Sequence, residues 1–326
     1  MKTTREQVLR ILKEKSPAAV SGEQIASELD LSRAAVWKAI QNLRSGGFQI
    51  TSKPSLGYTL TEGSYRLSEE DISLNLSPSW KDRVSLKVLE TVDSTNQEAK
   101  RLLADGAGDL AVVLSSHQTK GKGRLGRTFY SPPGTGLYLS VIVKRELDMS
   151  DAILVTSAAA VAVRETLSVY TDRDIGIKWV NDLYIEGKKV SGILTEGTSS
   201  FESGKMESMI IGIGINLFPP EEGFPEEIRN IATALFESPT PQVNTIAASL
   251  IEHVAAILEQ LHDRSVMNRY RNYSIVLDRT VSVTQGSLSY TATVTAINDD
   301  GSLTVTDDQG EKRLLNSGEI SLRVAE

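Results

Sequence analysis

The sequence predicts an α+β protein of several domains: a helical head that ends in a β-hairpin, a central mixed α/β domain and a small all-β tail. Apolar residues at helical spacing alternate with strand-like runs through most of the chain. After residue 273 the pattern changes to short β runs separated by Gly and Asp turns. A length of 326 residues suggests about two domains of roughly 150 residues each, to which the tail adds a small third. We expect the boundaries to lie at 1–65, 66–272 and 273–326.

The first two helices of the head follow from apolar spacing and a cap. Val8, Ile11 and Leu12 share one face of a helix expected over residues 4–15. Ser21 and Gln24 have the spacing of a capping box, in which each side chain accepts from the backbone N–H of the other residue. A short second helix therefore begins after Ser21.

A third helix and a hairpin complete the order expected of a winged helix-turn-helix. Ser32 can cap a helix that ends at residues 45–47, where glycine tolerates the left-handed backbone of a C-cap. Alternating residues near 48–50 and 58–60 predict the two hairpin strands. In this fold the last helix enters the DNA major groove. The predicted DNA contacts are its outward-facing residues and a lysine of the wing: Ser32, Arg33, Ala34, Trp37, Lys38, Gln41 and Lys53.

The charge distribution agrees with a DNA-binding head on an acidic body. The net charge of −7 excludes a general polyanion binder. Residues 1–63 contain nine Lys or Arg and six Asp or Glu, which gives +3, so the remainder carries −10. A chance fluctuation in charge and a helical module that docks a protein remain the alternatives.

Strand-like and helical runs of residues predict the elements of the central domain and the tail. Strand-like runs at 86–90, 111–115, 138–143, 189–194 and 209–215 alternate with helical runs at 96–104, 152–169 and 243–261. The tail has strand-like runs at 280–284, 289–297, 303–306 and 320–324, with a hairpin turn at 298–301. A small β-barrel fits the tail.

Composition excludes several kinds of protein. There is no cysteine, so disulfide scaffolds, thiolate metal sites and cysteine nucleophiles are excluded. The longest nearly apolar stretch, 152–163, is shorter than the ~20 residues of a membrane span, and no secretory signal is visible, so we expect a cytoplasmic protein with no membrane partner. No P-loop motif occurs, and Gly212-Ile-Gly214 is only half of a dinucleotide-binding fingerprint.

Three polar clusters could carry chemistry. The loop from Gly121 to Arg127 has three glycines and closely spaced cations, which suits phosphate, although a solvated basic loop has the same composition. Lys178, Asn181 and Asp182 end an apolar run and could bind a nucleotide or its metal, or form a polar turn. In the segment 93–96, Ser94 or Thr95 could cap the helix that begins near Asn96.

Together and in this order, the three clusters resemble the biotin–protein ligases. The segments 189–194 and 212–216 and the terminal residues 318–322 extend the resemblance over essentially the whole chain. The winged helix in front resembles the bifunctional branch of the family, which also represses the biotin operon. Two residues depart from the usual family pattern: Lys122 replaces an arginine and Val180 replaces a proline. A lysine keeps the charge but loses the planar fork of an arginine.

The resemblance implies a fold, an activity and partners. The fold would be a class II synthetase-like mixed α/β catalytic domain followed by an SH3-like β-barrel. The enzyme would activate biotin with ATP and Mg²⁺ to biotinyl-5′-AMP and transfer biotin to a lysine of a biotin carboxyl carrier protein. Operator DNA and a second copy of the chain, in a ligand-promoted homodimer, would be its other partners.

The resemblance also implies roles for single residues. Lys189 and Arg124 would be catalytic, and Asp182 is a possible Mg²⁺ ligand. From their composition, glycine-rich in 121–126 and Pro- and Gly-containing among acids in 219–229, we expect these two segments to be mobile and to become ordered over the bound ligand. The expected biotin-binding residues are Ser94, Thr95, Asn96, Gln118, Lys122, Gly123, Arg124 and Lys189. The expected ATP or adenylate-binding residues are Arg124, Arg127, Phe129, Lys178, Asn181 and Asn216.

Three alternatives stay open at this point. A lipoate or octanoate ligase would share the catalytic fold, although those relatives lack a winged helix. A biotin-sensing transcription factor without catalysis would keep both domains but lose turnover. A ligase whose winged helix no longer reads DNA would have the same pattern.

Overall fold

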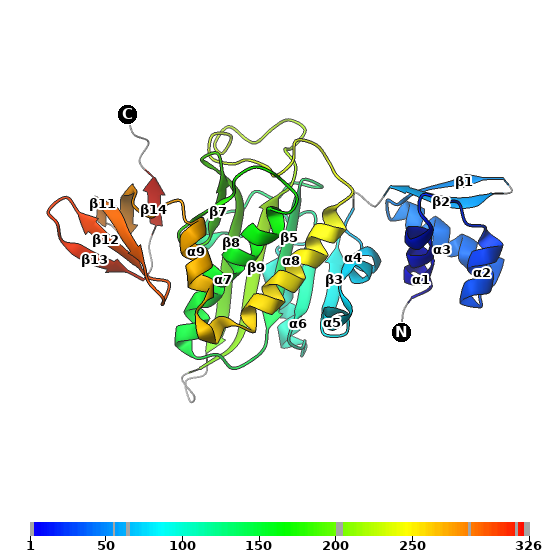
Figure 1. Cartoon of the computed structure of the whole chain (residues 1–326), viewed down its shortest axis with the longest axis horizontal. Coiled ribbons are helices and arrows are strands. Elements are labelled where there is room, and N and C mark those ends of the chain that lie inside the picture. Colours follow the sequence, from blue (N-terminus) through cyan, green and yellow to red (C-terminus); the bar gives the residue numbers. More distant parts are fainter. Residues whose placement is uncertain are drawn as a thin grey trace.

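The computed structural model describes residues 3–54, 56–62, 66–199, 205–285, 288–316 and 319–322. Figure 1 shows three parts in a row: the helical head at one end, a central sheet covered by helices, and a small sheet at the other end. Within these ranges, no helix has the length and apolar character needed to cross a membrane.

The head has the predicted element order and its own core. Its elements are α1 (Thr4–Lys15), α2 (Gly22–Leu29), α3 (Arg33–Ser45), β1 (Gln49–Lys53) and β2 (Gly57–Glu62). The capping box of Ser21 and Gln24 is present, and the Ser32 hydroxyl accepts from the Ala35 N–H. The left-handed residue after α3 is Gly47, with φ 94°, whereas Gly46 has φ −76°.

Two short helices, α4 (Glu69–Asn75) and α5 (Pro78–Lys81), join the head to the centre. Lys13 of α1 forms an ion pair with Asp71 of α4, whose side chain is buried. Arg5 pairs with Glu70 at 3.2 Å, and Glu6 pairs with Lys81 at 2.9 Å. Ion pairs from α1 to α4 and α5 therefore attach the head to the central domain.

A seven-stranded sheet forms the middle of the molecule, in the order β3-β4-β5-β9-β8-β7-β6. All neighbouring strands are antiparallel except β3 and β4, which are parallel. The strands are β3 (Ser85–Leu89), β4 (Ala111–Ser115), β5 (Gly136–Val143), β6 (Gly176–Lys178), β7 (Asp182–Ile185), β8 (Lys188–Ser199) and β9 (Met206–Asn216).

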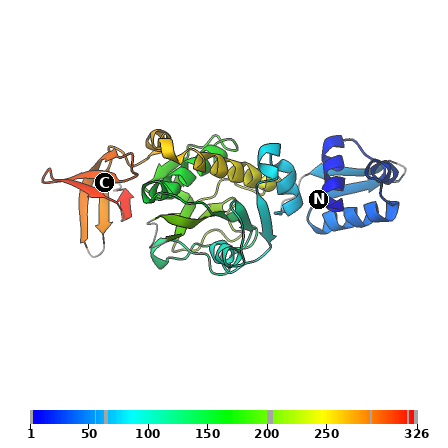
Figure 2. The ribbon, with the colours of Figure 1, turned by 90° about the horizontal axis from the view of Figure 1, so that it is seen from below.

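Helices cover both faces of this sheet (Figure 2). On one face lie α7 (Met149–Leu167), α8 (Val243–Leu258) and α9 (Val266–Tyr273), which pack against buried residues such as Leu139 and Ile213. On the other face, Ala99 of α6 (Thr95–Ala104) packs against Val113 and Ile210. The centre is thus the predicted mixed α/β domain, with a sheet between two helical layers.

The C-terminal part is a five-stranded antiparallel sheet in the order β13-β12-β11-β10-β14. Its strands are β10 (Thr280–Gln285), β11 (Leu288–Ile297), β12 (Leu303–Asp307), β13 (Lys312–Leu315) and β14 (Glu319–Leu322). Among the described residues, β13 and β14 are the two edges and do not pair, so the predicted barrel is not closed there. The last two residues of the predicted strand 320–324, and Gly318, lie outside the described residues.

Candidate functional site

A cavity of about 600 Å³ opens over β8 and β9 of the central sheet. It is lined by the start of α6, the loop from Gln118 to Tyr130, the segment from Lys178 to Asp182, and residues 224–232. All of the predicted biotin and nucleotide residues line this single cavity, although they come from segments as far apart as Ser94 and Asn216. The predicted DNA-binding residues lie apart from it, on the head.

Amide and hydroxyl groups gather at one end of the cavity. The Thr95 N–H and hydroxyl both donate to Gln118 Oε1, at 2.8 and 3.2 Å, and Gln118 Nε2 donates to the Ser131 hydroxyl at 3.1 Å. Ser94 is the N-cap residue of α6 by its backbone, but neither it nor Thr95 makes the predicted side-chain cap. Thr95 is already the first residue of the helix, and its hydroxyl donates to Gln118 instead of accepting from the backbone. The N–H groups of Ser94 and Thr95 themselves donate to Asp93 at 2.8 Å and to Gln118.

Two glycines on β9 make room for the cavity floor. A Cβ at Gly212 would lie 2.1 Å from Asn96 Oδ1, and a Cβ at Gly214 would lie 2.7 Å from the Phe129 ring. The Gly212-Ile-Gly214 motif therefore lets Asn96 and Phe129 lie directly against the sheet. Two glycines at alternate positions of a strand indicate that side chains pack closely on one face of the sheet. The sequence analysis did not draw this conclusion.

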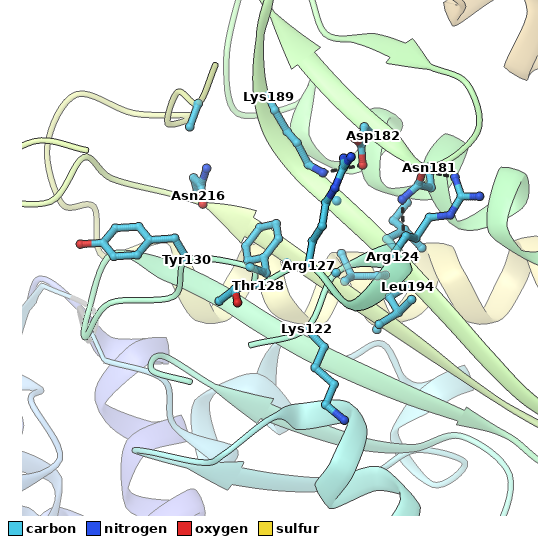
Figure 3. Close-up of a pocket in the computed structure, with 18 of the residues that line it drawn as sticks. Lys122, Arg124, Arg127, Thr128, Tyr130, Asn181, Asp182, Lys189, Leu194 and Asn216 are labelled. Atoms are coloured by element: carbon cyan, nitrogen blue, oxygen red, sulfur yellow. Dashed lines mark hydrogen bonds and ion pairs between the residues drawn. The ribbon is translucent and has the colours of Figure 1, made fainter. Parts of the chain in front are cut away.

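The other end of the cavity is rich in cations. Lys189 Nζ lies 2.6 Å from Asp182 Oδ1 and 5.9 Å from the Phe129 ring centre (Figure 3). Arg124 donates to Asn181 Oδ1 at 3.1 Å. The Asn181 amide is itself anchored to β8, because its Nδ2 donates to the Ile193 carbonyl at 2.8 Å.

Lys178 lies beside Tyr184 at this cationic end. Its ammonium group is 5.0 Å from the ring centre and donates to the Tyr184 hydroxyl at 3.3 Å. Burial, together with the nearby charge of Asp182, raises the pKa of Tyr184 to about 12. Tyr184 is therefore a neutral phenol near pH 7, and the local charge comes from the lysines, arginines and Asp182.

The side chain of Lys122 turns away from the cationic group. Figure 3 shows it pointing away from Lys189 and Asp182. Its backbone forms an isolated bridge with Thr128, which closes the glycine-rich loop into a narrow turn. Lys122 thus lines the cavity without contacting the Lys189–Asp182 pair.

Residues 224–232 line one side of the cavity and overlap the predicted closing segment 219–229. Phe224, Ile228 and Ile231 line the cavity, and the segment 224–232 is bonded to β8 through the backbone of Lys189. The Lys189 N–H donates to the Ile231 carbonyl at 2.8 Å, and the Thr233 N–H donates to the Lys189 carbonyl at 2.9 Å. Asn216 donates to the Thr233 carbonyl at 3.0 Å. Phe224 and Ile228 of the predicted closing segment 219–229 therefore line the cavity, and the residues after it are bonded to β8.

The side chains of the cavity do not form a dedicated metal site. In the described ranges, no group of three or more His, Cys, Asp or Glu side chains could hold a metal ion. Asp182, the possible Mg²⁺ ligand, is a single carboxylate that already contacts Lys189. Mg²⁺ usually keeps several waters and binds one or two carboxylates together with substrate phosphates, so it fits here only as a companion of ATP.

The predicted DNA-reading face of α3 is open to solvent. Arg33, Ala34 and Lys38 are exposed, and Trp37 has 57% of its surface exposed. Val36 and Ile40 of the same helix are buried in the core of the head. An indole exposed to this degree on a helix with a buried opposite face is available for an intermolecular contact.

Three family models match successive parts of the chain. Residues 4–59 match an HTH domain, residues 88–216 match the biotin/lipoate A/B protein ligase family, and residues 276–323 match the biotin protein ligase C-terminal domain. The matches follow the order of the three parts of the structure.

Relatives and solved structures agree with these matches. The chain is 32% identical to the bifunctional ligase/repressor BirA of Escherichia coli (strain K12), over 94% of each chain. It is also 32% identical to the BirA of Bacillus subtilis (strain 168), over 83% of this chain and 79% of the relative. The biotin protein ligase from Aquifex aeolicus in complex with biotin and ATP superposes with a TM-score of 0.60 and 26% identity, covering 74% of this chain and 99% of that one.

Proposed function

The chain belongs to the biotin–protein ligase family, in its bifunctional ligase/repressor branch, and on this premise we propose how its cavity and head work. The protein joins biotin to a lysine of a biotin carboxyl carrier protein and represses transcription through its head. The observation that supports this most directly is one cavity that holds hydrogen-bonding amide and hydroxyl groups at Thr95 and Gln118 and cations around Lys189. Biotin has a neutral ureido ring at one end and a carboxylate at the other.

In the first step a carboxylate oxygen of biotin attacks the α-phosphorus of ATP. An oxygen–phosphorus bond forms, the bond to the β-phosphate bridging oxygen breaks, and pyrophosphate leaves. Biotin and ATP are both anions, so the approach is opposed by charge repulsion. Lys189 and Arg124 at the cationic end would reduce this repulsion and stabilise the charge that develops on the phosphorus oxygens.

In the second step the amine of a carrier lysine attacks the acyl carbon of biotinyl-5′-AMP. An amide bond forms, AMP leaves with the electrons of the acyl–oxygen bond, and the amine loses a proton. Both nucleophiles come from substrates, so the enzyme needs to position the reactants rather than supply a nucleophile. The absence of cysteine from the chain is consistent with an enzyme that supplies no nucleophile of its own.

Asp182 would act through Lys189 before ATP binds. The 2.6 Å ion pair holds the Lys189 ammonium group at the cationic end of the cavity. The carboxylate of biotin or a phosphate of ATP can then bind the Lys189 ammonium group together with Asp182 or in its place. Mg²⁺ would enter with ATP and neutralise part of the phosphate charge.

The remaining role assignments follow the family pattern. Ser94, Thr95, Asn96 and Gln118 would hold the ureido ring, and Lys122 and Gly123 would lie over biotin. Phe129 would contact adenine, while Arg127, Lys178, Asn181 and Asn216 would address the rest of the nucleotide. All of these residues line the same cavity, which supports the assignment. We also propose the domain limits 1–65, 66–272 and 273–326 and an SH3-like class for the C-terminal sheet.

The head would bind operator DNA as part of a ligand-promoted homodimer. The exposed face of α3 would enter the major groove, and Lys53 of the wing would contact phosphate. Each head carries a charge of only +3, so a single head binds DNA weakly. Pairing two heads raises the effective concentration of the second head once the first has bound.

Mass spectrometry of a carrier domain tests the ligase. The purified protein is mixed with Mg-ATP, an apo biotin-carrier domain and either biotin, octanoate or lipoate. We expect one biotinyl group to be added to the carrier lysine, and only with biotin. A gain with octanoate or lipoate alone would identify a lipoate-type ligase instead. No gain with any acid would leave a sensor without catalysis.

Electrophoretic mobility shift with the biotin operator tests the repressor. We expect biotin and ATP together to raise the affinity, and analytical ultracentrifugation of the same samples to show dimers. If biotin and ATP together leave the affinity for operator DNA unchanged, the proposed coupling between ligand binding and repression is wrong.

A further inference from the structure

The amide of Asn96 is held by groups that were not among the predicted site residues. Its Nδ2 donates to Glu196 Oε2 at 2.8 Å and to the Leu194 carbonyl at 3.3 Å. Its Oδ1 accepts from the Ser140 hydroxyl at 2.6 Å. Asn96 is 4% exposed and Ser140 is fully buried, so these bonds are shielded from water at a residue that lines the cavity.

The orientation of this amide follows from the chemistry of its neighbours. A carboxylate and a backbone carbonyl only accept, so the NH₂ group must face Glu196 and Leu194. Both N–H bonds of Asn96 are then used within the protein. Oδ1 has two lone pairs and Ser140 takes one, so the hydrogen-bonding capacity that remains on Asn96, a cavity-lining residue, is that of an acceptor and not of a donor.

Glu196 is held in its charged form. Lys100 Nζ lies 2.7 Å from Glu196 Oε1, on the side away from Asn96. Burial by itself raises the pKa of Glu196, but the hydrogen bonds from Lys100 and Asn96 outweigh it and hold the pKa below the ordinary value. A carboxylate near pH 7 cannot donate to Asn96, which keeps the amide in one orientation.

We propose that Glu196 is a positioning residue for ligand specificity, acting through Asn96. It fixes the Asn96 amide so that Oδ1 accepts an N–H from the ligand. This inference rests on the proposed function, because the ureido ring of biotin carries such N–H groups. Octanoate and lipoate carry none and would leave a buried oxygen without a partner, which costs affinity.

A glutamine at position 196 tests the inference with almost no change in shape. Glu196→Gln leaves one oxygen, which the charged Lys100 takes, so the new NH₂ group faces Asn96. The Asn96 amide then turns, and its NH₂ meets the N–H of biotin. We expect isothermal titration calorimetry to give about a tenfold weaker biotin affinity, with the KM for ATP within about twofold of the wild type.

A second variant shows whether the effect passes through Asn96. Asn96→Asp combined with Glu196→Gln places an acceptor opposite the new NH₂ group and again presents an acceptor to the cavity. We expect the double variant to bind biotin more tightly than Glu196→Gln alone. A purely structural role of Glu196 predicts further loss instead, so a double variant that binds no better than Glu196→Gln overturns the inference.

Glu98→Gln is the matched control. Glu98 lies on α6 and pairs with a lysine, Lys87, at 2.6 Å, as Glu196 pairs with Lys100, but its hydrogen bonds go to Lys87 and Arg101 and not to Asn96. Its biotin affinity is expected within about twofold of the wild type. A loss under threefold in Glu196→Gln, or an equal loss in Glu98→Gln, overturns the proposal for Glu196. A wild-type protein that binds no biotin overturns the proposed function itself, and with it this role of Asn96.

Discussion

The indole N–H of Trp179 donates to the backbone carbonyl of Gly301 at 3.0 Å, which bonds the centre of the molecule to the C-terminal sheet. Gly301 lies in the hairpin turn between β11 and β12, and Trp179 lies next to Lys178 in the cavity wall. The Tyr270 hydroxyl donates to the Val180 carbonyl at 3.1 Å, close to the same point. The C-terminal sheet therefore supports the segment that the nucleotide would contact.

Trp179→Phe keeps an aromatic ring but removes the hydrogen bond to Gly301, so we expect weaker binding of ATP. We expect the KM for ATP to rise several-fold and the affinity for biotin to change less, as measured by adenylate formation and by calorimetry. Trp80→Phe, in the short helix α5, is the control and should leave the KM for ATP unchanged. Equal effects of the two substitutions would contradict a link between the C-terminal sheet and the nucleotide.

Lys189→Met should lower the rate of adenylate formation by about 10²-fold or more, the usual loss when one charge-stabilising group is removed. Single-turnover pyrophosphate release measures this step directly. Lys188→Met, which removes the neighbouring lysine, should stay within about twofold of the wild type. A Lys189→Met enzyme with normal turnover and only a raised KM for biotin would assign Lys189 to binding alone.

Gly214→Ala should disturb Phe129, because the new Cβ would lie 2.7 Å from its ring. The ring must move off the sheet, and we expect the KM for ATP to rise by about tenfold. Gly108→Ala is the control, since a Cβ there has no atom within 4 Å and should leave the KM unchanged. An unchanged KM in Gly214→Ala would show that Phe129 does not contact the nucleotide.

Asp71→Ala should destabilise the junction between the head and the centre. Asp71 is 2% exposed, pairs with Lys13 and accepts from Asn244 Nδ2 at 3.2 Å. Removing one partner of a mostly buried pair leaves the others unsatisfied, so we expect a loss of about 2–3 kcal/mol in urea unfolding. Glu14→Ala, in an exposed pair with Arg10, should cost less than about 1 kcal/mol. If Asp71→Ala and Glu14→Ala lower the free energy of unfolding by similar amounts, the Asp71 contacts do not stabilise the junction.

Tyr138 should make the protein less stable at alkaline pH. Burial raises its pKa from about 10 to about 12 in the folded state. Between these values the unfolded chain releases the phenol proton first, so the free energy of unfolding falls as pH rises, by ~1.4 kcal/mol at pH 11. Tyr138→Phe should show a shallower fall between pH 9 and 11 in urea unfolding. An unchanged slope would contradict this contribution.

Local interactions let the sequence determine much of the secondary structure. Helix α1 has the predicted bounds, and the capping box at Ser21 and Gln24 forms as expected, because both depend on residues within one or two turns of each other. The run at 152–169 became α7, which begins three residues and ends two residues earlier than predicted. The run at 243–261 became α8, which begins as predicted and ends three residues earlier. The short strands β6, β7 and β13 were not predicted, since three or four residues carry little periodicity.

The cavity residues could be named from the sequence only because the motif order resembles a known family. Asp93 through Asn96, Gly121 through Arg127, and Lys189 are each ambiguous alone. Their convergence in one cavity depends on the sheet order, which sets β9 between β5 and β8. The sequence placed the N-cap of α6 at Ser94 or Thr95 but did not show that neither side chain makes the cap bond, since the Thr95 hydroxyl donates to Gln118, 23 residues away.

What the sequence by itself determined is the set of local elements and the residue types of a phosphate- and carboxylate-binding site. Only the tertiary structure decided which groups meet: Lys189 with Asp182, Trp179 with Gly301, and Asn96 with Glu196, 100 positions apart. Helical periodicity and caps arise between near neighbours and leave a pattern in the chain. A hydrogen bond between distant residues leaves no such pattern, because it exists only after strands and helices have packed.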